Sequence, residues 1–361
     1  MKLQNGGAEY IRAEIDRAVK NGTRCAIIKG DWFIEEAVRI PSDFELILDS
    51  CHLVQADGIF DNMFVNEHHG TELGKTIAGT DKNISIVGRG GATLDGGKYN
   101  GLSEKTQLKN GMPHVSKNNL ILFTNVDGFE MKNFTVKNQR WWAMNFIYCR
   151  NGVISGIHSE ADDTCIDSEG NEYHGLSLEH YYDMLRKQCD GIDIRQGCNH
   201  ILIENITGFS GDDMVALTAV MGKMEAANAV EGLPIDISHI MVRNIVCETL
   251  AANVRLLCQG GAIMHDILVD GVEDTSGKSG HLLTHGIFGV RVGDTHLYCG
   301  RHAIEEEFYN IKIKNVRSRA DYALGLAGNE IKSLTYENIV AFDGAKCIEN
   351  RLGEEGSNEW R

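Results

Sequence analysis

A short pattern recurs along this sequence from residue 82 onward. Each copy opens with a polar residue or a glycine and continues as an alternating apolar strand, a polar corner and a second short strand. Copies begin at Asn83, Gly128, Gly152, His200, His239, His265, Asn310 and Ser333. Neighbouring copies lie about 22 to 24 residues apart, or about twice 20 where one coil is irregular, the period of a coil with three short parallel strands. The sequence therefore predicts an all-β fold, a parallel β-helix of about nine to ten coils.

The ends of the chain fit this architecture. Gly7 to Asn21 has an apolar helical face made of Tyr10, Ile11, Ile15, Ala18 and Val19, and Gly22 stops the helix. Such a helix would close the open end of a β-stack, because exposed strand edges invite aggregation. We expect one domain over residues 1–361, with a cap at 1–24, coils at 25–345 and a tail at 346–361. Inward-pointing rows should contain Ile201, Ile203, Ile240, Val242, Ile267, Val269, Ile311 and Ile313.

Composition narrows the function. The formal net charge is −16, with 35 Lys and Arg against 51 Asp and Glu, which argues against nucleic-acid binding. The sequence contains no run of eighteen apolar residues, so it predicts no membrane span. The ten cysteines are scattered without a C-x-x-C pair, as in proteins with free thiols in a reducing compartment. We therefore expect a cytoplasmic protein without a cofactor, although the mature form of a secreted protein would look the same.

Three carboxylates lie at strand edges about one structural repeat apart. They are Asp190, Asp212 and Asp213. Stacked coils would bring them together, and proteins usually keep such repulsion where a proton is held or a cation is bound. Two segments that break the repeat flank them, 170–188 and 222–232, and loops on a rigid scaffold often carry binding residues.

The sequence around these acids resembles a known enzyme family. Asp190-Gly-Ile-Asp193, the strand 199–205 and Gly211-Asp212-Asp213 are similar to the Asn-Thr-Asp and Gly-Asp-Asp motifs of glycoside hydrolase family 28, the polygalacturonases and rhamnogalacturonases. The segments 83–88, 92–97 and 138–142 are similar too, so the resemblance spans roughly residues 5 to 345. It implies a right-handed, single-stranded parallel β-helix and hydrolysis with inversion.

The resemblance also implies roles for the acids. Asp190 and Asp213 match carboxylates that activate water, and Asp212 matches the general acid. Inversion needs a gap of roughly 6.5 to 9.5 Å between acid and base to admit a water molecule. Carboxylates on neighbouring coils can span that gap, and their repulsion keeps a proton on one of them.

Two departures from the family affect the expected substrate. Residues 222–232 contain no His where the family has a Gly-His-Gly motif. The Arg-Ile-Lys motif is matched only by Arg255, because Leu257 stands in place of the lysine. An arginine alone can still bind a carboxylate bidentately, but a neutral or singly charged sugar, or a short oligosaccharide, becomes plausible.

Further residues are candidates for substrate binding. Trp141 and Trp142 would offer an aromatic face to a sugar, although one of the two is expected in the core. Asp163, in an acidic cluster with Asp162 and Asp167, would extend the groove, bind Ca²⁺ or simply be solvated. His174, like His158 and His180, lies near the groove without a zinc-site spacing. A later loop, 277–293, contains His281, His285 and Arg291 and would line a subsite or be an ordinary long loop. The predicted binding set is Arg255, Trp141, Trp142, Asp163, His174 and Asp193.

Three functions remain open from the sequence. The first is a glycosidase that acts on a pectin-type or related oligosaccharide or polysaccharide, with insertions that close one end of the groove and make it exo-acting. The second is a polysaccharide lyase, which would need Ca²⁺ and a base such as Arg255 near the α-proton. The third is a non-catalytic, tailspike-like module that binds carbohydrate.

Overall fold

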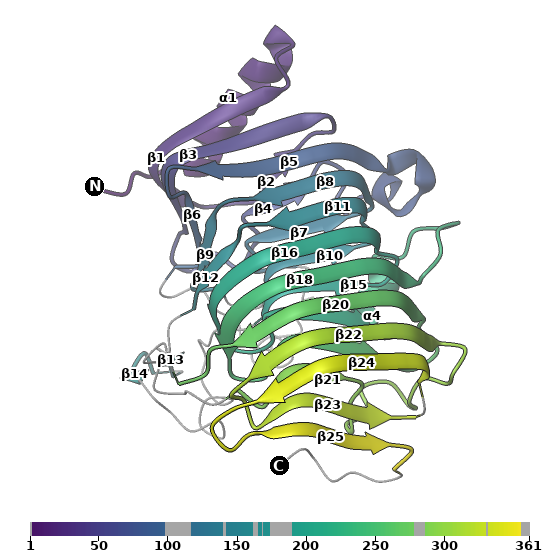
Figure 1. Cartoon of the computed structure of the whole chain (residues 1–361). Helices are drawn as coiled ribbons and strands as arrows, with labels where there is room; N and C mark the ends of the chain where they lie inside the picture. The colour runs from purple at the N-terminus through teal and green to yellow at the C-terminus, as the bar shows by residue number, and fades with distance from the viewer. Residues whose placement is uncertain are drawn as a thin grey trace.

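The chain winds into a right-handed parallel β-helix, which confirms the predicted fold class (Figure 1). The structure is a computed structural model, and it describes residues 2–97, 117–139, 142–161, 165–167, 169–173, 190–277, 286–329 and 331–354. Coils stack from the N-terminal helix at one end to the last strand at the other (Figure 1). None of the helices among these residues is long and apolar enough to cross a membrane.

Two long parallel sheets form the walls of the helix. The larger contains β1 (Cys25–Ile34), β3 (Phe44–Gln55), β5 (Asp81–Arg89), β6 (Thr93–Asp95), β8 (Val126–Lys132), β9 (Thr135–Lys137), β11 (Arg150–Ser155), β12 (His158–Glu160), β16 (Asn199–Ser210), β18 (Ile237–Thr249), β20 (Met264–Asp274), β22 (Phe308–Ser318) and β24 (Lys332–Ala341). The smaller contains β2 (Val38–Ile40), β4 (Phe64–Asn66), β7 (Ile121–Thr124), β10 (Trp142–Ile147), β15 (Asp190–Arg195), β17 (Val215–Ala219), β19 (Ala252–Cys258), β21 (Phe288–Val292), β23 (Tyr322–Gly328) and β25 (Lys346–Leu352).

The remaining elements are short. A small antiparallel pair consists of β13 (Cys165–Ile166) and β14 (Glu172–Tyr173). Two 3₁₀ turns, η1 (Leu73–Lys75) and η2 (Ile77–Gly79), follow β4, and the helix α4 (Lys223–Ala227) follows β17.

A polar residue near the start of the sequence repeats has a specific backbone role. Asn83, His200, His239, Asp266 and Asn310 all have φ between 51° and 56°, at the second or third residue of their strands. Asn, Asp and His adopt this left-handed conformation more readily than most residues. A second left-handed position, such as Asn205 (φ 56°) and Asn244 (φ 55°), bends each long strand of the larger sheet into two arms. The predicted coil of three short strands is thus two arms and one strand of the smaller sheet.

The predicted inward rows are buried and in register. Ile201 pairs with Ile240, Ile240 with Ile267 and Ile267 with Ile311 in successive coils, each at most 2% exposed. The row that starts at Ile203 is arranged in the same way. Each such side chain contributes roughly 1.5 to 3 kcal/mol when it is fully buried, so the stacked rows supply most of the core.

The helix α1 (Gly7–Asn21) closes the N-terminal end. It ends at Gly22, which has φ 70°, and its buried side chains include Ala8, Ile11, Ile15 and Ala18. Val19 was expected on the apolar face but is 42% exposed. At the other end, β25 pairs in parallel with β23, so the coils continue beyond residue 345 into the segment expected as a tail.

Candidate active site

A row of outward-facing residues, polar except for one alanine, crosses the smaller sheet. Asn145 pairs with Asp193, Asp193 with Ala216, Ala216 with Arg255 and Arg255 with Arg291, one residue from each successive coil. Neighbouring strands lie about 4.8 Å apart, so the paired Arg255 and Arg291 are adjacent, while Asp193 lies two strands from Arg255. The row forms the floor of the candidate site.

The three predicted carboxylates lie together at one edge of this floor. Asp190 is the first residue of β15, while Asp212 and Asp213 lie in the turn before β17, and oxygens of the three are within 4.8 Å of one another. The turn is held against β15 because the Gly191 amide donates to the Asp213 carbonyl at 3.0 Å. A Cβ at residue 191 would lie 2.6 Å from the Met214 carbonyl oxygen, so the close approach requires glycine. The expected gap of about 6.5 to 9.5 Å between acid and base is therefore not observed.

Asp213 is the most firmly held of the three. It is 2% exposed, its Oδ1 accepts a hydrogen bond from the Ala252 amide at 3.0 Å, and its Oδ2 lies 3.3 Å from Nη1 of Arg255. Burial raises the pKa of Asp213 to about 6, against the lowering effect of Arg255. Its oxygens are largely used within the protein, which suits a positioning role.

Asp190, which is half-buried, and Asp193, which is fully buried, lie near each other on β15. Burial, and then the charges of Asp193, Asp212 and Asp213, raise the pKa of Asp190 well above its ordinary value. Burial raises the pKa of Asp193 to about 7, although its ion pair with Arg195 at 2.9 Å lowers it. Acids this close titrate as a group, so the cluster keeps at least one proton near neutral pH.

Two arginines lie beside the acids. Nη2 of Arg255 is 2.6 Å from Asp294 and 3.0 Å from the Tyr298 hydroxyl, and Nη2 of Arg291 also donates to Asp294. Leu257 is buried, but Arg291 on the next strand supplies a second cation near Arg255. Sequence reasoning placed Arg291 only in a long loop and missed Asp294 and Tyr298, because their contacts depend on the pairing between coils.

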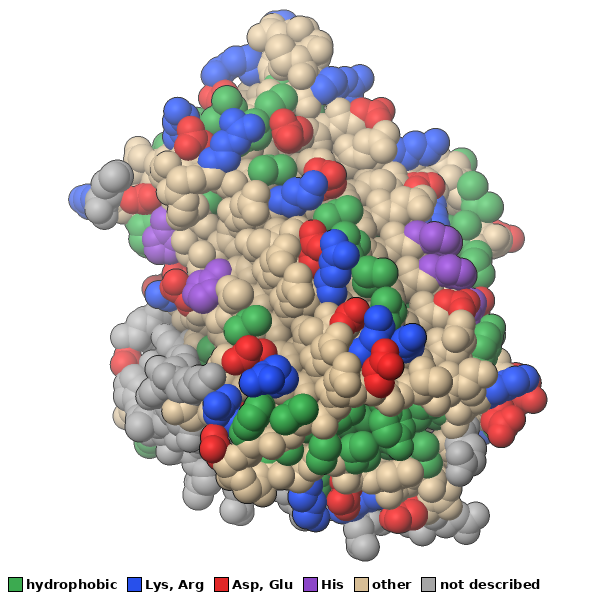
Figure 2. Space-filling model, viewed as in Figure 1, with side chains coloured by type: hydrophobic (Ala, Val, Ile, Leu, Met, Phe, Trp, Pro, Cys, Tyr) green, Lys and Arg blue, Asp and Glu red, His purple; other side chains and the backbone are tan. Residues whose placement is uncertain are grey.

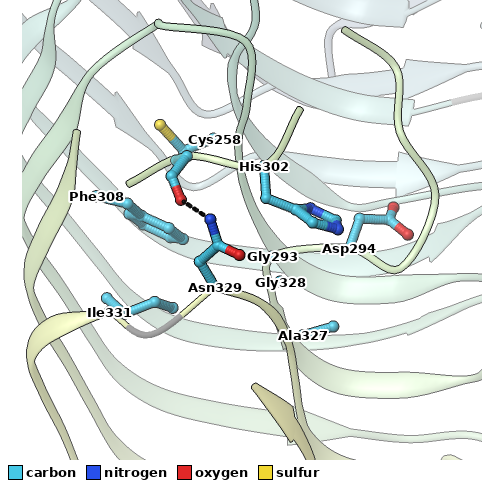
Figure 3. Close-up of a pocket in the computed structure, with 10 residues that line it drawn as sticks. Cys258, Gly293, Asp294, His302, Phe308, Ala327, Gly328, Asn329 and Ile331 are labelled. Carbon is cyan, nitrogen blue, oxygen red and sulfur yellow. Dashed lines mark hydrogen bonds between the residues drawn. The ribbon is translucent and has the colours of Figure 1, made fainter. Parts of the chain in front are cut away.

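Asp294 lines a small cavity. The cavity has a volume of about 10 Å³, room for roughly one water molecule, and the His302 ring points toward Asp294 across it (Figure 3). Burial lowers the pKa of His302, so this side chain is neutral at neutral pH. Asp294 therefore balances its charge against Arg255 and Arg291.

The segment after β17 folds back over the outer face of the smaller sheet. This closing segment, residues 222–236, buries Val230 against Val65, Leu122 and Ile147 of earlier coils. The Glu231 amide donates to the Lys75 carbonyl at 3.0 Å, which fixes the segment beside η1. The outer face of the first coils is thus covered, and the floor is closed on that side of the acids.

An ion pair anchors the closing segment to the acid cluster. Glu225, in α4, is 2% exposed, and its Oε1 lies 3.1 Å from Nη1 of Arg195, which also binds Asp193. The Arg195 guanidinium lies 3.8 Å from the centre of the Trp142 ring. One face of Trp142 is therefore covered, and only its other face could accept a sugar. Of the other predicted binding residues, Trp141, Asp163 and His174 lie outside the described residues.

Comparison with known proteins gives a family match for part of the chain. Residues 60–232, which contain all three acids, match the family model described as glycosyl hydrolases family 28. A search of curated proteins finds no match to the sequence.

The structure is similar to several solved structures at low sequence identity. A 1,3-α-1,4-β-D-galactose-4-sulfate-3,6-anhydro-D-galactose-2-sulfate 4 galactohydrolase has 13% identity and a TM-score of 0.56, covering 98% of this chain and 88% of that one. A tailspike protein mutant of E. coli bacteriophage HK620 has 12% identity and a TM-score of 0.56, covering 96% and 62%. A hyperthermoactive exopolygalacturonase from Thermotoga maritima has 12% identity and a TM-score of 0.46, covering 92% and 77%.

The first two likenesses show a shared β-helix fold, and the family match adds the segment that carries the acids. The resemblance to glycosyl hydrolases family 28 is therefore confirmed over residues 60–232, and the chain is a glycosidase.

Proposed function

We propose that this chain hydrolyses a terminal glycosidic bond of a pectin-type or related oligosaccharide. The observation that carries the proposal is the group Asp190, Asp212 and Asp213, with oxygens within 4.8 Å, beside Arg255. Hydrolysis requires one protonated and one ionised carboxyl at the same pH, and a coupled acid cluster provides both.

The proposed roles follow the access of each carboxyl. Asp212 is half-buried and donates a proton to the glycosidic oxygen as the bond to the anomeric carbon breaks. Asp190, also half-buried, accepts a proton from the water that attacks that carbon when the proton shared by the cluster lies on Asp212. Asp213 orients Arg255 and adds negative charge that stabilises the oxocarbenium-like transition state.

The charge around Arg255 favours a neutral or singly charged sugar. Arg255 and Arg291 both bind Asp294, and Arg255 also binds Asp213, so little positive charge remains for the substrate. The two guanidinium side chains are 14% and 15% exposed, which leaves an edge of each within reach of one carboxylate or of hydroxyl groups. Tyr298, 52% exposed, adds an aromatic face beside them.

The closing segment supports action at chain ends. It covers the outer face of the sheet from β17 back to β4, and Glu225 fixes it next to Asp193 through Arg195. A sugar chain that crosses the acids would meet the closing segment, so the end of the sugar chain must lie next to this segment. A chain terminus fits such a site, while the interior of a polymer does not.

The stereochemical outcome is a separate test. The family resemblance implies inversion, and we keep it in the proposal. The short distance among the carboxylate oxygens is closer to the separation of about 5 to 5.5 Å found in retaining enzymes. Proton NMR of the first product anomer distinguishes the two, and initial release of the retained anomer would replace inversion with a covalent mechanism through one of these acids.

A screen of plant and host oligosaccharides tests the function itself. We expect release of reducing sugar by the native protein, loss of that release in Asp212→Asn, and full activity in Asp343→Asn, an exposed acid paired only with Arg319 in the described structure. An increase in absorbance from an unsaturated product would instead identify a lyase. Binding without any bond cleavage in every oligosaccharide class would identify a carbohydrate-binding module.

A further inference from the structure

A cluster of imidazoles and a carboxylate lies away from the acids, where strands of the larger sheet begin. His239 belongs to β18, and His265 and Asp266 belong to β20, the next coil. One possible ligand atom from each lies within 4.8 Å of the other two. Nδ1 of His265 is 2.7 Å from Oδ2 of Asp266, and Nε2 of His239 is 3.7 Å from the same oxygen. Figure 2 shows histidine side chains side by side at one edge of this face.

The other polar atoms of His265 and Asp266 have neighbours of their own. Nε2 of His265 is 3.6 Å from Oδ2 of Asp236, and Oδ1 of Asp266 accepts a hydrogen bond from Asn310. A histidine that binds a metal through one ring nitrogen commonly donates its other N–H to a carboxylate, and a ligating carboxylate is commonly held by a second hydrogen bond. Asn310 supplies the second feature, and Asp236 lies close enough to Nε2 of His265 to supply the first after a small movement.

The rings are also held by stacking. His200 stacks on His239 with centroids 4.6 Å apart, and Tyr309 stacks on His265 at 4.8 Å. The two histidines are 49% and 13% exposed, so His239 is free to adjust while His265 is nearly fixed. Such a site is open to solvent on the His239 side and rigid on the other.

The backbone row explains why His239 and Asp266 face each other. Both occupy the left-handed position at the third residue of their strands, in adjacent coils. In other coils this row contains Asn, as where Asn83 donates to Asp43 at 2.7 Å. A His at 239 places a ring nitrogen, a metal ligand, where the amide nitrogen would otherwise be.

We propose that His239 Nε2, His265 Nδ1 and Asp266 Oδ2 bind one divalent transition-metal ion of the Zn²⁺ type. Two imidazoles and a carboxylate are suitable ligands for Zn²⁺ at about 2.0 to 2.2 Å, with a fourth position for water. Tetrahedral ligands at these bond lengths lie roughly 3.3 to 3.5 Å from one another. Nδ1 of His265 and Oδ2 of Asp266, now 2.7 Å apart, must therefore separate slightly, and Nε2 of His239 must move closer, which the 33% exposed Asp266 and the 49% exposed His239 allow. The ion joins two consecutive coils, and the site is independent of the proposed hydrolase function.

Calorimetric titration of the full chain with Zn²⁺ tests the site. We expect one ion per chain, loss of this binding in His239→Asn and in His265→Tyr, and a dissociation constant about 10 to 100-fold higher in Asp236→Asn. Both ligand variants are chosen to fold, because Asn occupies the same row in other coils and Tyr309 occupies the register position next to His265. His158→Asn, which removes an exposed histidine on another strand, is the matched control and should bind as the native protein does.

Titration with Co²⁺ separates this site from the thiols. Imidazole and carboxylate ligands give d–d bands without the intense thiolate charge-transfer band that cysteine ligands produce. Binding that persists in His239→Asn, a thiolate band, or no binding of either ion by the native protein would each overturn the proposal.

Discussion

The ion pair between Glu225 and Arg195 is the contact that most directly connects the closing segment to the acid cluster. Glu225→Ala removes the carboxylate and leaves Arg195, 6% exposed, with Asp193 as its remaining ionic partner. Breaking a buried ion pair costs about 3 to 5 kcal/mol when the remaining charge has no other partner. Because Asp193 still neutralises Arg195, we expect the lower end, about 3 kcal/mol.

This loss should open the segment locally rather than unfold the coils. Glu225 binds Arg195 on the outer face of the smaller sheet, away from the stacked core rows. Val230, the bond from Glu231 to Lys75 and the bond from the Gly197 amide to the Ile235 carbonyl also hold the segment. A change of about 3 kcal/mol shifts an opening equilibrium by roughly 100-fold. Hydrogen exchange of residues 222–236 should therefore increase by about that factor, with the exchange of β18 and β20 unchanged.

Viscosity and reducing ends, followed together on a long homopolymer, give the functional result. The native protein should release reducing ends with little loss of viscosity, and Glu225→Ala should lower viscosity faster for the same release. Glu225→Gln keeps the shape and one hydrogen bond, so it should lie between the two. Faster exchange without any change in the product pattern would refute the idea that this segment closes the groove, and a rapid loss of viscosity with the native protein would refute exo action itself.

Three further predictions concern the charges of the site. Asp212→Asn should lower kcat by a factor of about 10² to 10⁴. Its melting temperature should change little, because this half-buried side chain is outside the core. An unchanged kcat would show that Asp212 is not the general acid. Since burial raises the pKa of Asp193 from 3.8 to about 7, the folded state binds more protons than the unfolded state in this window, and stability should fall by up to ~4 kcal/mol as pH rises from about 4 to 7. Urea unfolding of Asp193→Asn should show a weaker dependence over the same window, and an equal slope would contradict the assignment. Arg291→Gln should raise KM for a singly charged oligosaccharide by about tenfold or more with a smaller change in kcat, whereas an equal effect on a neutral oligosaccharide would indicate a structural role.

Much of the scaffold could be predicted because each coil repeats the same local requirement. A residue that tolerates positive φ stands near the start of a strand and before its alternating part, as at Asn83, His200 and Asn310, and the alternation itself fixes which side chains face inward. The convergence of Asp190 with Asp212 follows from the same regularity, because one repeat of chain returns to the same face. Their distance did not follow, since it depends on how closely Gly191 allows the turn before β17 to approach.

The contacts of the closing segment and the second arginine could not be predicted from local pattern. The break in the repeat at 222–232 predicted a loop beside the acids, but only three-dimensional packing shows that Val230 covers Leu122 and Ile147. Arg291 follows a long loop of irregular length, so its pairing with Arg255 depends on a strand register that the sequence does not define.

The replacement of the family's lysine by Leu257 therefore has a smaller effect on the site than the sequence alone suggests. On the outer face of a β-helix, a side chain two residues along one strand and a side chain on the adjacent strand are at similar distances from a given residue, about 7 Å and 5 Å. A cation lost from residue 257 can thus be replaced from the next coil, as Arg291 does beside Arg255. Asp294 binds both guanidiniums, and it reduces the net positive charge of the pair to that of a single cation. The site retains two planar groups for hydrogen bonding but little excess charge, which is the combination expected for a sugar with one carboxylate or none.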